Sequence, residues 1–163
     1  RNTTSSTFRA LWVQPLRSDA PARLTRRQRQ KATGTSFAQQ TAEWNAENAQ
    51  QIVQAVIDSG KKFNVIYAEN DDMAKGAVAA LDKAGISHGV GKDVIIMGFD
   101  CNKWALEELL AKRWNYDGQC NPFQASYIND IIKNGAKQKT VIMEEKGFDA
   151  ATITKADVAK YGI

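Results

Sequence analysis

The segment Phe63–Gly85, FNVIYAENDDMAKGAVAALDKAG, constrains the fold of this chain more than any other. It begins with a short apolar run, Phe63–Ala68, which is typical of a buried strand in a sheet covered on both faces. The polar residues Asn70–Asp72 then interrupt the pattern and can cap the free amide groups of a helix. We expect that helix to end at Gly85, because glycine suits the left-handed conformation that commonly closes a helix. A strand leading directly into a helix places Asn70 where open α/β sheets bind ligands.

Strand and helix patterns alternate along the chain from Ser36 onward. After a short strand near Ser36, apolar residues at helical spacing predict a helix from about Ala46, capped by Asn45 and ended by Gly60. The other expected elements are strands at 94–99, 114–120 and 141–143, and helices at 103–112 and 122–134. This alternation predicts an α/β fold with a doubly wound, mostly parallel sheet. Right-handed crossovers would place the strand ends at one edge of that sheet.

Two motifs carry a family resemblance: YAENDDMAKGAVAAL at 67–81 and GKDVIIMGFD at 91–100. Together they resemble the C-terminal half of periplasmic sugar-binding proteins of the ribose/galactose type. These type I solute-binding proteins are the extracytoplasmic components of ABC sugar importers. The similarity covers roughly residues 34–163, which are expected to form a single C-terminal sugar-binding lobe. The effector-binding lobe of lac-repressor-type transcriptional regulators shares the fold and a similar Asn-Asp-x-Met-Ala element, so it is the alternative.

The resemblance implies carbohydrate recognition without catalysis. The expected partners are a monosaccharide ligand, an ABC permease and the N-terminal lobe, which is almost wholly missing from this chain. In such proteins the sugar lies between two lobes that close over it, so we expect little or no sugar affinity from this lobe alone. A homodimer through the lobe face that is left uncovered is a further expectation. The location implied is periplasmic or extracellular, with a lipoprotein as one form.

Polar and aromatic side chains follow the predicted strands at the ligand edge. Sugar recognition requires amides and carboxylates that bond neighbouring hydroxyls, and an aromatic ring that lies against the C–H face. The resemblance places Trp44 where the family has a sugar-stacking aromatic, and Asn70 and Asp100 where it has polar sugar contacts. The sequence AEWNAEN around Trp44 is polar and favours an exposed position for the ring. The candidate ligand-binding residues are Trp44, Asn70, Asp100, Gln119 and Asn121.

The end of the fourth strand departs from the family. Its last polar sugar contact aligns with Cys120, so either Gln119 or Asn121 is expected to replace that contact. Cys101 and Cys120 each follow a predicted strand at the ligand edge. They are either two unrelated small core residues or, if the two strands are neighbours in an oxidising compartment, a disulfide.

Several candidate residues also have a purely structural interpretation. Asn70 can act as a helix cap without any ligand, and Asp100 can accept hydrogen bonds from the turn after its strand. Trp104 and Trp114 fall at inward-facing positions and are expected to pack in the core. We favour ligand contact for Asn70 and Asp100 because the surrounding motifs match the family.

No catalytic or cofactor motif is recognisable, and we expect neither an enzyme nor a cofactor. Asp71 and Asp72 are adjacent on a helix and point about 100° apart, so they are poorly placed for acid–base catalysis. The chain has one histidine, His88, and no CxxC pair, so no metal site is expected. Glycine-rich phosphate loops of the GxGxxG or GxxxxGK form are also missing from the sequence.

The first 33 residues form an atypical basic arm. Residues 1–31 carry eight Lys or Arg against one acid, whereas the rest carries 14 basic and 17 acidic side chains, so the overall charge of +4 arises from the arm. We therefore expect no nucleic-acid partner. Pro15 and Pro21 oppose a long helix, and the arm is interpreted as either a partly disordered extension or a frame-shifted segment. No apolar run has the roughly 18 residues that a membrane span requires, and the arm has no signal-peptide core.

Overall fold

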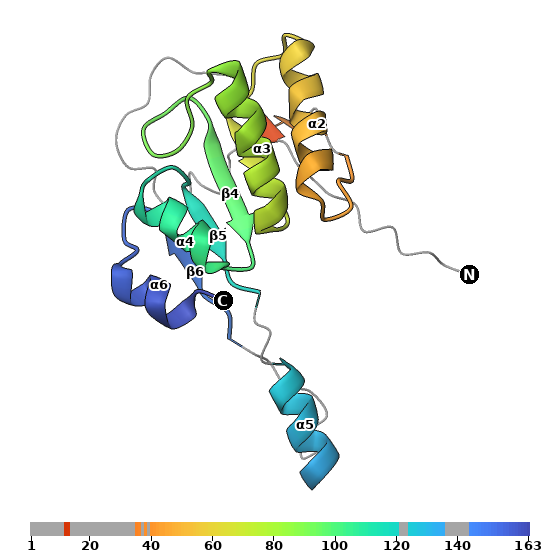
Figure 1. The fold of residues 1–163 in the computed structure, drawn as a ribbon, viewed down its shortest axis with the longest axis vertical. Coiled ribbons are helices and arrows are strands. Elements are labelled where there is room, and N and C mark those ends of the chain that lie inside the picture. The colour runs from red at the N-terminus through yellow and green to blue at the C-terminus, as the bar shows by residue number, and fades with distance from the viewer. Residues whose placement is uncertain (1–11, 14–34, 37, 39, 121–123, 136–143) are drawn as a thin grey trace, which may run out of the picture.

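A four-stranded sheet in the order β3-β4-β5-β6 forms the centre of the computed structural model (Figure 1). The structure describes residues 12–13, 35–36, 38, 40–120, 124–135 and 144–163. The strands are β3 (Val65–Tyr67), β4 (Ile95–Phe99), β5 (Tyr116–Gly118) and β6 (Gly147–Asp149). The pairs β3–β4 and β4–β5 are parallel, whereas β6 runs antiparallel to β5. The prediction of a mostly parallel α/β sheet is therefore confirmed.

The helices other than α5 form two groups around this sheet. The helix bounds are α2 (Ala46–Asp58), α3 (Asp71–Ala84), α4 (Lys103–Leu110), α5 (Gln124–Asn134) and α6 (Lys155–Tyr161). Helix α2 packs along α3, which contacts β3 and β4, while α4 contacts β5 and α6. Helix α5 extends away from the sheet (Figure 1), and its isoleucines Ile128 and Ile132 are exposed.

Local capping residues define the start of α2 and both ends of α3, as the sequence predicts. The Asn45 carboxamide accepts a hydrogen bond from Asn48 N at 3.0 Å and starts α2. The Asn70 carboxamide accepts from Met73 N at 2.9 Å and starts α3. Gly85 ends α3 with φ of 67°, the left-handed conformation that glycine adopts without a steric penalty.

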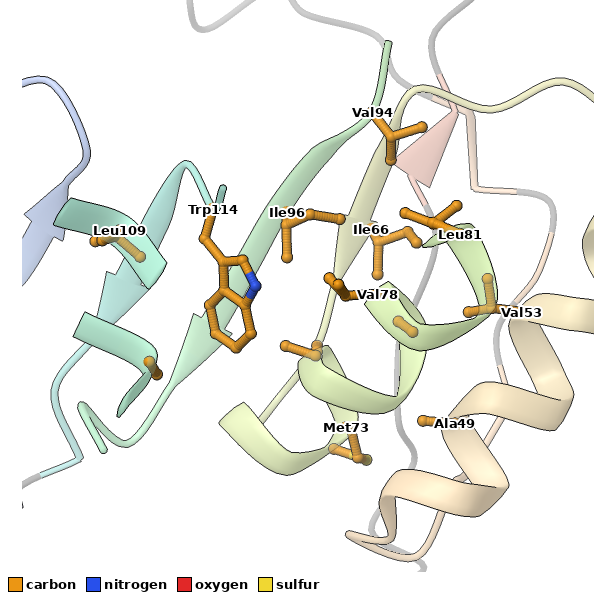
Figure 2. Packing of buried hydrophobic residues seen from close by; sticks show 14 of the residues in the cluster. Ala49, Val53, Ile66, Met73, Val78, Leu81, Val94, Ile96, Leu109 and Trp114 are labelled. Carbon is orange, nitrogen blue, oxygen red and sulfur yellow. The ribbon is translucent and has the colours of Figure 1, made fainter. Parts of the chain in front are cut away.

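The core lies between the sheet and its helices (Figure 2). Ile66 of β3 and Ile96 of β4 are fully buried and face Leu81 and Val78 of α3. Trp114 is also buried and makes an edge-on contact with Trp104, with ring centroids 5.8 Å apart. Both tryptophans thus pack with the core, as expected.

A close approach of two backbones fixes the position of α2 against α3. A Cβ atom added at Gly76 of α3 would lie only 1.9 Å from the carbonyl oxygen of Ala46. Because no side chain fits there, the start of α2 rests directly on the early turns of α3. This contact also positions the loop that precedes α2.

A second, two-stranded sheet pairs β1 (Trp12–Val13) with β2 (Thr35–Ser36) in antiparallel orientation. The short strand expected near Ser36 is therefore present, but the prediction that it belongs to the main, mostly parallel sheet is wrong. Strand β1 belongs to the basic arm, for which the sequence predicts no regular element. It contacts β3 of the main sheet.

The C-terminal part of the chain differs from the prediction. The strand predicted at 141–143 lies outside the described residues, and the last strand of the sheet is β6, which is antiparallel. Its sequence, Gly-Phe-Asp after three charged residues, has no apolar alternation that would indicate a strand. Helix α6 was not predicted either, although Thr154 and Asp157 form a capping box that starts it.

Candidate functional site

The carboxyl ends of β3, β4 and β5 lie side by side and carry the candidate residues Asn70, Asp100 and Gln119. The backbone N–H of Ala68, after β3, donates to Met97 O of β4 at 3.0 Å. The N–H of Asp100, after β4, donates to Gly118 O of β5 at 2.9 Å. The three strand ends are thus in register. They form the candidate ligand edge, which lies at the same end of the molecule as the starts of α2 and α3 (Figure 1).

Asn70 serves as the helix cap of α3 through its side-chain oxygen. Among the described residues its side-chain nitrogen has no hydrogen-bond partner, and the residue is half-buried. The two interpretations of Asn70 are therefore compatible. Its oxygen is engaged by the helix, while its –NH₂ group is available to a sugar hydroxyl.

Asp100 adopts an unusual backbone conformation with φ of 126°, and the next residue, Cys101, has φ of 62°. Residues other than glycine are strained in this region, and such strain tends to cluster at ligand sites. Burial raises the pKa of Asp100, and the neighbouring Asp72 raises it further. Asp100 therefore lies at the ligand edge in a strained turn, which contacts with the surrounding residues have to stabilise.

Trp44 lies in a strained turn immediately before α2. Trp44 and its neighbour Glu43 have φ values of 58° and 52°. The carbonyl oxygen of Ala42 holds the turn, since it accepts from Asn45 N at 2.9 Å and from Asn48 Nδ2 at 3.3 Å. The Trp44 side chain is 51% exposed, as the surrounding polar sequence predicts. An exposed indole at this position can lie against the C–H face of a sugar.

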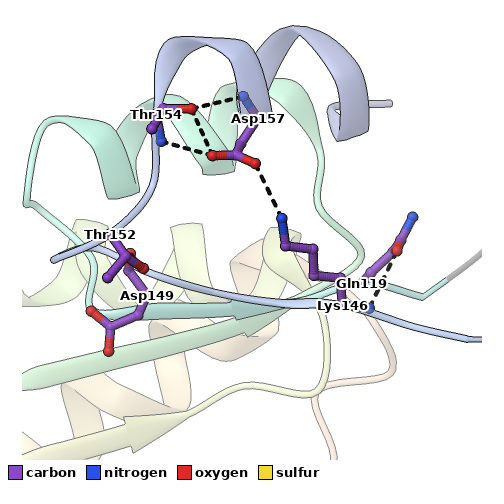
Figure 3. A network of polar contacts seen from close by, with 6 residues as sticks. All are labelled: Gln119, Lys146, Asp149, Thr152, Thr154 and Asp157. Atoms are coloured by element: carbon purple, nitrogen blue, oxygen red, sulfur yellow. Dashed lines mark hydrogen bonds and ion pairs between the residues drawn. The ribbon is translucent and has the colours of Figure 1, made fainter.

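Gln119 bonds to the chain opposite it through its backbone N–H and its side-chain oxygen. Its N–H donates to Lys146 O at 2.8 Å, and its side-chain oxygen accepts from Lys146 N at 3.4 Å (Figure 3). Lys146 in turn contacts Asp157 of the α6 capping box at 3.1 Å. Gln119 therefore holds the start of β6 against the end of β5. Asn121, the alternative candidate, lies outside the described residues.

Cys101 and Cys120 are both free thiols, so the disulfide considered from the sequence does not form in this structure. Cys101 is fully buried in the core cluster, whereas Cys120 is exposed. Burial raises the pKa of the Cys101 thiol far above its usual value, and nearby Asp117 adds to this effect. The interpretation of Cys101 as a small core residue is the correct one.

Two buried acids that the sequence did not reveal, Asp71 and Asp117, lie beneath the ligand edge. Both are fully buried. Burial raises the pKa of Asp71 to about 7 and that of Asp117 to about 9. For Asp117 a signal was available, because an acid inside a strand, between Tyr116 and Gly118, is unusual. For Asp71 the sequence gives no such signal, because an exposed acid is common in the first turn of a helix.

The described part of the chain contains no group of three or more His, Cys, Asp or Glu side chains arranged to hold a metal ion. Nor does any helix there have the length and apolar character needed to cross a membrane. The polar groups at the ligand edge are amides and carboxylates, which suit an uncharged polyhydroxylated ligand.

The fold and this edge define a ligand-binding α/β lobe, and comparisons with known proteins identify its family. Residues 28–140 match the family model for the periplasmic binding protein domain, and the chain belongs to that family. It is 32% identical to the fructose import binding protein FruE of Bifidobacterium longum, over 72% of this chain and 36% of that protein. The recognition from sequence of a type I binding protein of the ribose/galactose type is thereby confirmed.

Two further relatives are similar to parts of this chain. A Mycobacterium smegmatis protein solved in complex with β-D-fucofuranose superposes with a TM-score of 0.60 at 28% identity, covering 69% of this chain and 38% of that one. The transcriptional regulator AscG of Escherichia coli is 37% identical over a shorter segment, 35% of this chain and 16% of that protein. The chain thus spans less than half the length of each of these relatives.

Proposed function

We propose that this chain is the carbohydrate-binding component of an ABC sugar import system and binds a monosaccharide at the ligand edge. The observation that supports this proposal is that Asn70 and Asp100 follow two neighbouring parallel strands, while the turn with Trp44 precedes α2, whose start rests on α3. These residues come from three separate loops, and each offers a group that sugar recognition requires. The names of the relatives that match most of the chain support import rather than regulation.

The three side chains have complementary roles in this proposal. The Asn70 –NH₂ group donates to one sugar hydroxyl, while the Asp100 carboxylate accepts from one or two others. The exposed indole of Trp44 covers the apolar face of the ring. Such contacts fix the orientation of a small polar ligand without any catalytic group.

We infer that this lobe alone binds sugar weakly. The candidate contacts reach a sugar from one side, whereas the resemblance places the ligand between two lobes that close over it. A ligand held from one side keeps much of its surface in water and gains little binding free energy. The permease partner and the extracytoplasmic location belong to this same proposal.

The regulator alternative has less support. The match to a regulator covers 35% of this chain, whereas the match to an import binding protein covers 72%. The shared segment is therefore explained by a common fold, which by itself does not determine function.

Solution NMR tests the proposal directly. We would titrate the chain with a panel of pentoses and hexoses and follow the Asn70 and Asp100 amides and the Trp44 indole N–H. We expect these signals to shift together for at least one sugar, with millimolar affinity. Shifts that avoid the ligand edge, or no shift with any sugar, would contradict the proposed site. Micromolar affinity would contradict the inference that the lobe binds weakly.

A further inference from the structure

Two acids lie buried next to each other beneath the ligand edge, and neither forms an ion pair with a cation in the described part of the chain. Asp71 is the first residue of α3, and Asp117 lies in the middle of β5; both are fully buried. Three of their four side-chain oxygens, Asp71 Oδ1 and both oxygens of Asp117, have no donor among the described residues. A buried acceptor without a donor is costly, so this arrangement needs a physical explanation.

A shared proton explains the pair. The two side chains are within hydrogen-bonding reach of each other. Burial raises the pKa of both, the charge of Asp71 raises the pKa of Asp117 further, and the hydrogen bond with Asp117 lowers the pKa of Asp71. Two carboxylates in contact inside a core cannot both be ionised. A proton on one of them supplies the missing donor and removes one of the two charges.

The fold leaves space for this arrangement at a specific position. A Cβ atom on Gly98 of β4 would lie 2.6 Å from Asp71 Oδ1, so only glycine admits the carboxyl group there. Trp114 closes the same space from the side, 2.8 Å from that Cβ position. The acid pair is therefore enclosed by the packing around it.

We propose that Asp71 and Asp117 share one proton and act as positioning residues that hold the Asp100–Asn102 turn at the ligand edge. Asp71 Oδ2 accepts from Asn102 N at 2.8 Å and from Asn102 Nδ2 at 3.1 Å. These bonds hold Asn102 directly after the two residues with left-handed backbone. The claim that this turn positions Asp100 for a ligand rests on the proposed function. The claim that the two acids share a proton does not.

The other ionisable groups that face the pair are acidic as well. Asp100 raises the pKa of both acids, and Cys101 lies against Asp117. Asp72 acts on Asp100 in the same direction. Lys75 of α3 lies instead over the ring of Trp104, 4.9 Å from its centroid. When the shared proton leaves, the second charge is therefore uncompensated, and repulsion displaces Asp71 from Asn102.

The experiment is a carboxyl-carbon NMR titration of the whole chain from about pH 5 to about pH 10. We expect one aspartate to keep its proton through neutral pH, and the amide signals of Asp100 and Asn102 to move as that proton is lost. In D117N the amide donates to Asp71 without a titratable proton, so the turn signals should lose this pH response. D58N, which changes an exposed acid at the end of α2, should behave as the wild type.

Two results would overturn the inference. One is a wild-type chain in which every aspartate is ionised at about pH 6. The other is a titration in which the amide signals of Asp100 and Asn102 do not shift as the shared proton is lost. The wild-type titration decides the first point even if D117N fails to fold. Sugar titrations at both ends of the pH range then separate the two proposals. If no sugar binds at either pH, the proposed function is contradicted but the shared proton is not. If a sugar binds with the same affinity at both ends of the pH range, the positioning role is contradicted.

Discussion

Asn102 donates both its backbone N–H and its side-chain –NH₂ to one carboxylate oxygen of Asp71, a residue 31 positions earlier in the sequence. This pair of bonds connects the turn after β4 to the first turn of α3. It therefore joins the loop that carries Asp100 to the helix that Asn70 caps. Hydrogen bonds to a charged acceptor are stronger than those between neutral groups.

Replacing Asn102 with alanine should destabilise the chain by about 1 kcal/mol. The side-chain donor is lost while the backbone donor remains, and the site is only partly buried. Urea unfolding measures this change. N129A, at an exposed position on α5, is the control and should change the free energy of unfolding by less than about 0.5 kcal/mol. Equal stability of the two variants would show that the Asp71–Asn102 bond contributes nothing.

The stability of the chain should fall as the pH rises from about 5 to about 9. The folded-state pKa values of Asp71 and Asp117 are raised above the unfolded value, so the folded state binds more protons in this range. Their contribution is complete below about pH 4 and is lost as the pH rises through both folded-state values. Unfolding in urea at a series of pH values measures the slope. D117N should flatten it, and an unchanged slope would show that Asp117 is not the group responsible.

Local signals in the sequence predicted the elements of the sheet from β3 to β5. Capping by Asn70, closure by Gly85 and the apolar runs around Ile66 and Ile96 each determine structure within a few residues. The elements that were missed depend on distant parts of the chain. Strand β6 pairs with β5 through backbone groups, and the three residues of β6 carry no pattern that would reveal it.

The sequence predicted the position of a candidate site residue only where that residue follows a predicted strand. Asn70 and Asp100 follow their strands directly, so their position at the ligand edge follows from the parallel sheet. Sequence gives no sign that Gln119 bonds to Lys146, 27 residues later. The acid pair was missed for the same reason, because Asp71 and Asp117 meet only through the packing of α3 on the sheet.

The two cysteines should react at very different rates. Cys120 is exposed, whereas Cys101 is fully buried. Burial raises the pKa of both thiols, and for Cys101 it raises the pKa far above its usual value. A thiol reagent should therefore modify Cys120 in the folded chain, and Cys101 only after unfolding. Counting modified thiols by mass spectrometry, with C120S as the control, tests this expectation. Failure of both thiols to react until a reductant is added would show that the disulfide forms after all.

Substituting Gly76 with alanine should destabilise the chain by about 3 kcal/mol. The new methyl group would collide with the backbone carbonyl of Ala46, which no side-chain rotation can relieve. G60A is a matched control, because Gly60 has φ of 70° but open space around it, so alanine there costs only about 1 kcal/mol of backbone strain. Thermal unfolding compares the two. A smaller loss of stability in G76A than in G60A would contradict the close packing of α2 on α3.

Two substitutions of Asn70 should separate its structural role from its role in ligand binding. Alanine removes both the cap and the –NH₂ donor, so N70A should lose about 1 kcal/mol of stability together with any sugar response. Serine also caps helices but has no amide donor, so N70S should keep most of the stability while its sugar-induced NMR shifts weaken. W44A, which alters an exposed ring, should likewise leave stability nearly unchanged and weaken binding. Full sugar response in N70S would mean that Asn70 acts as a cap alone, and the ligand edge would have to be assigned without it.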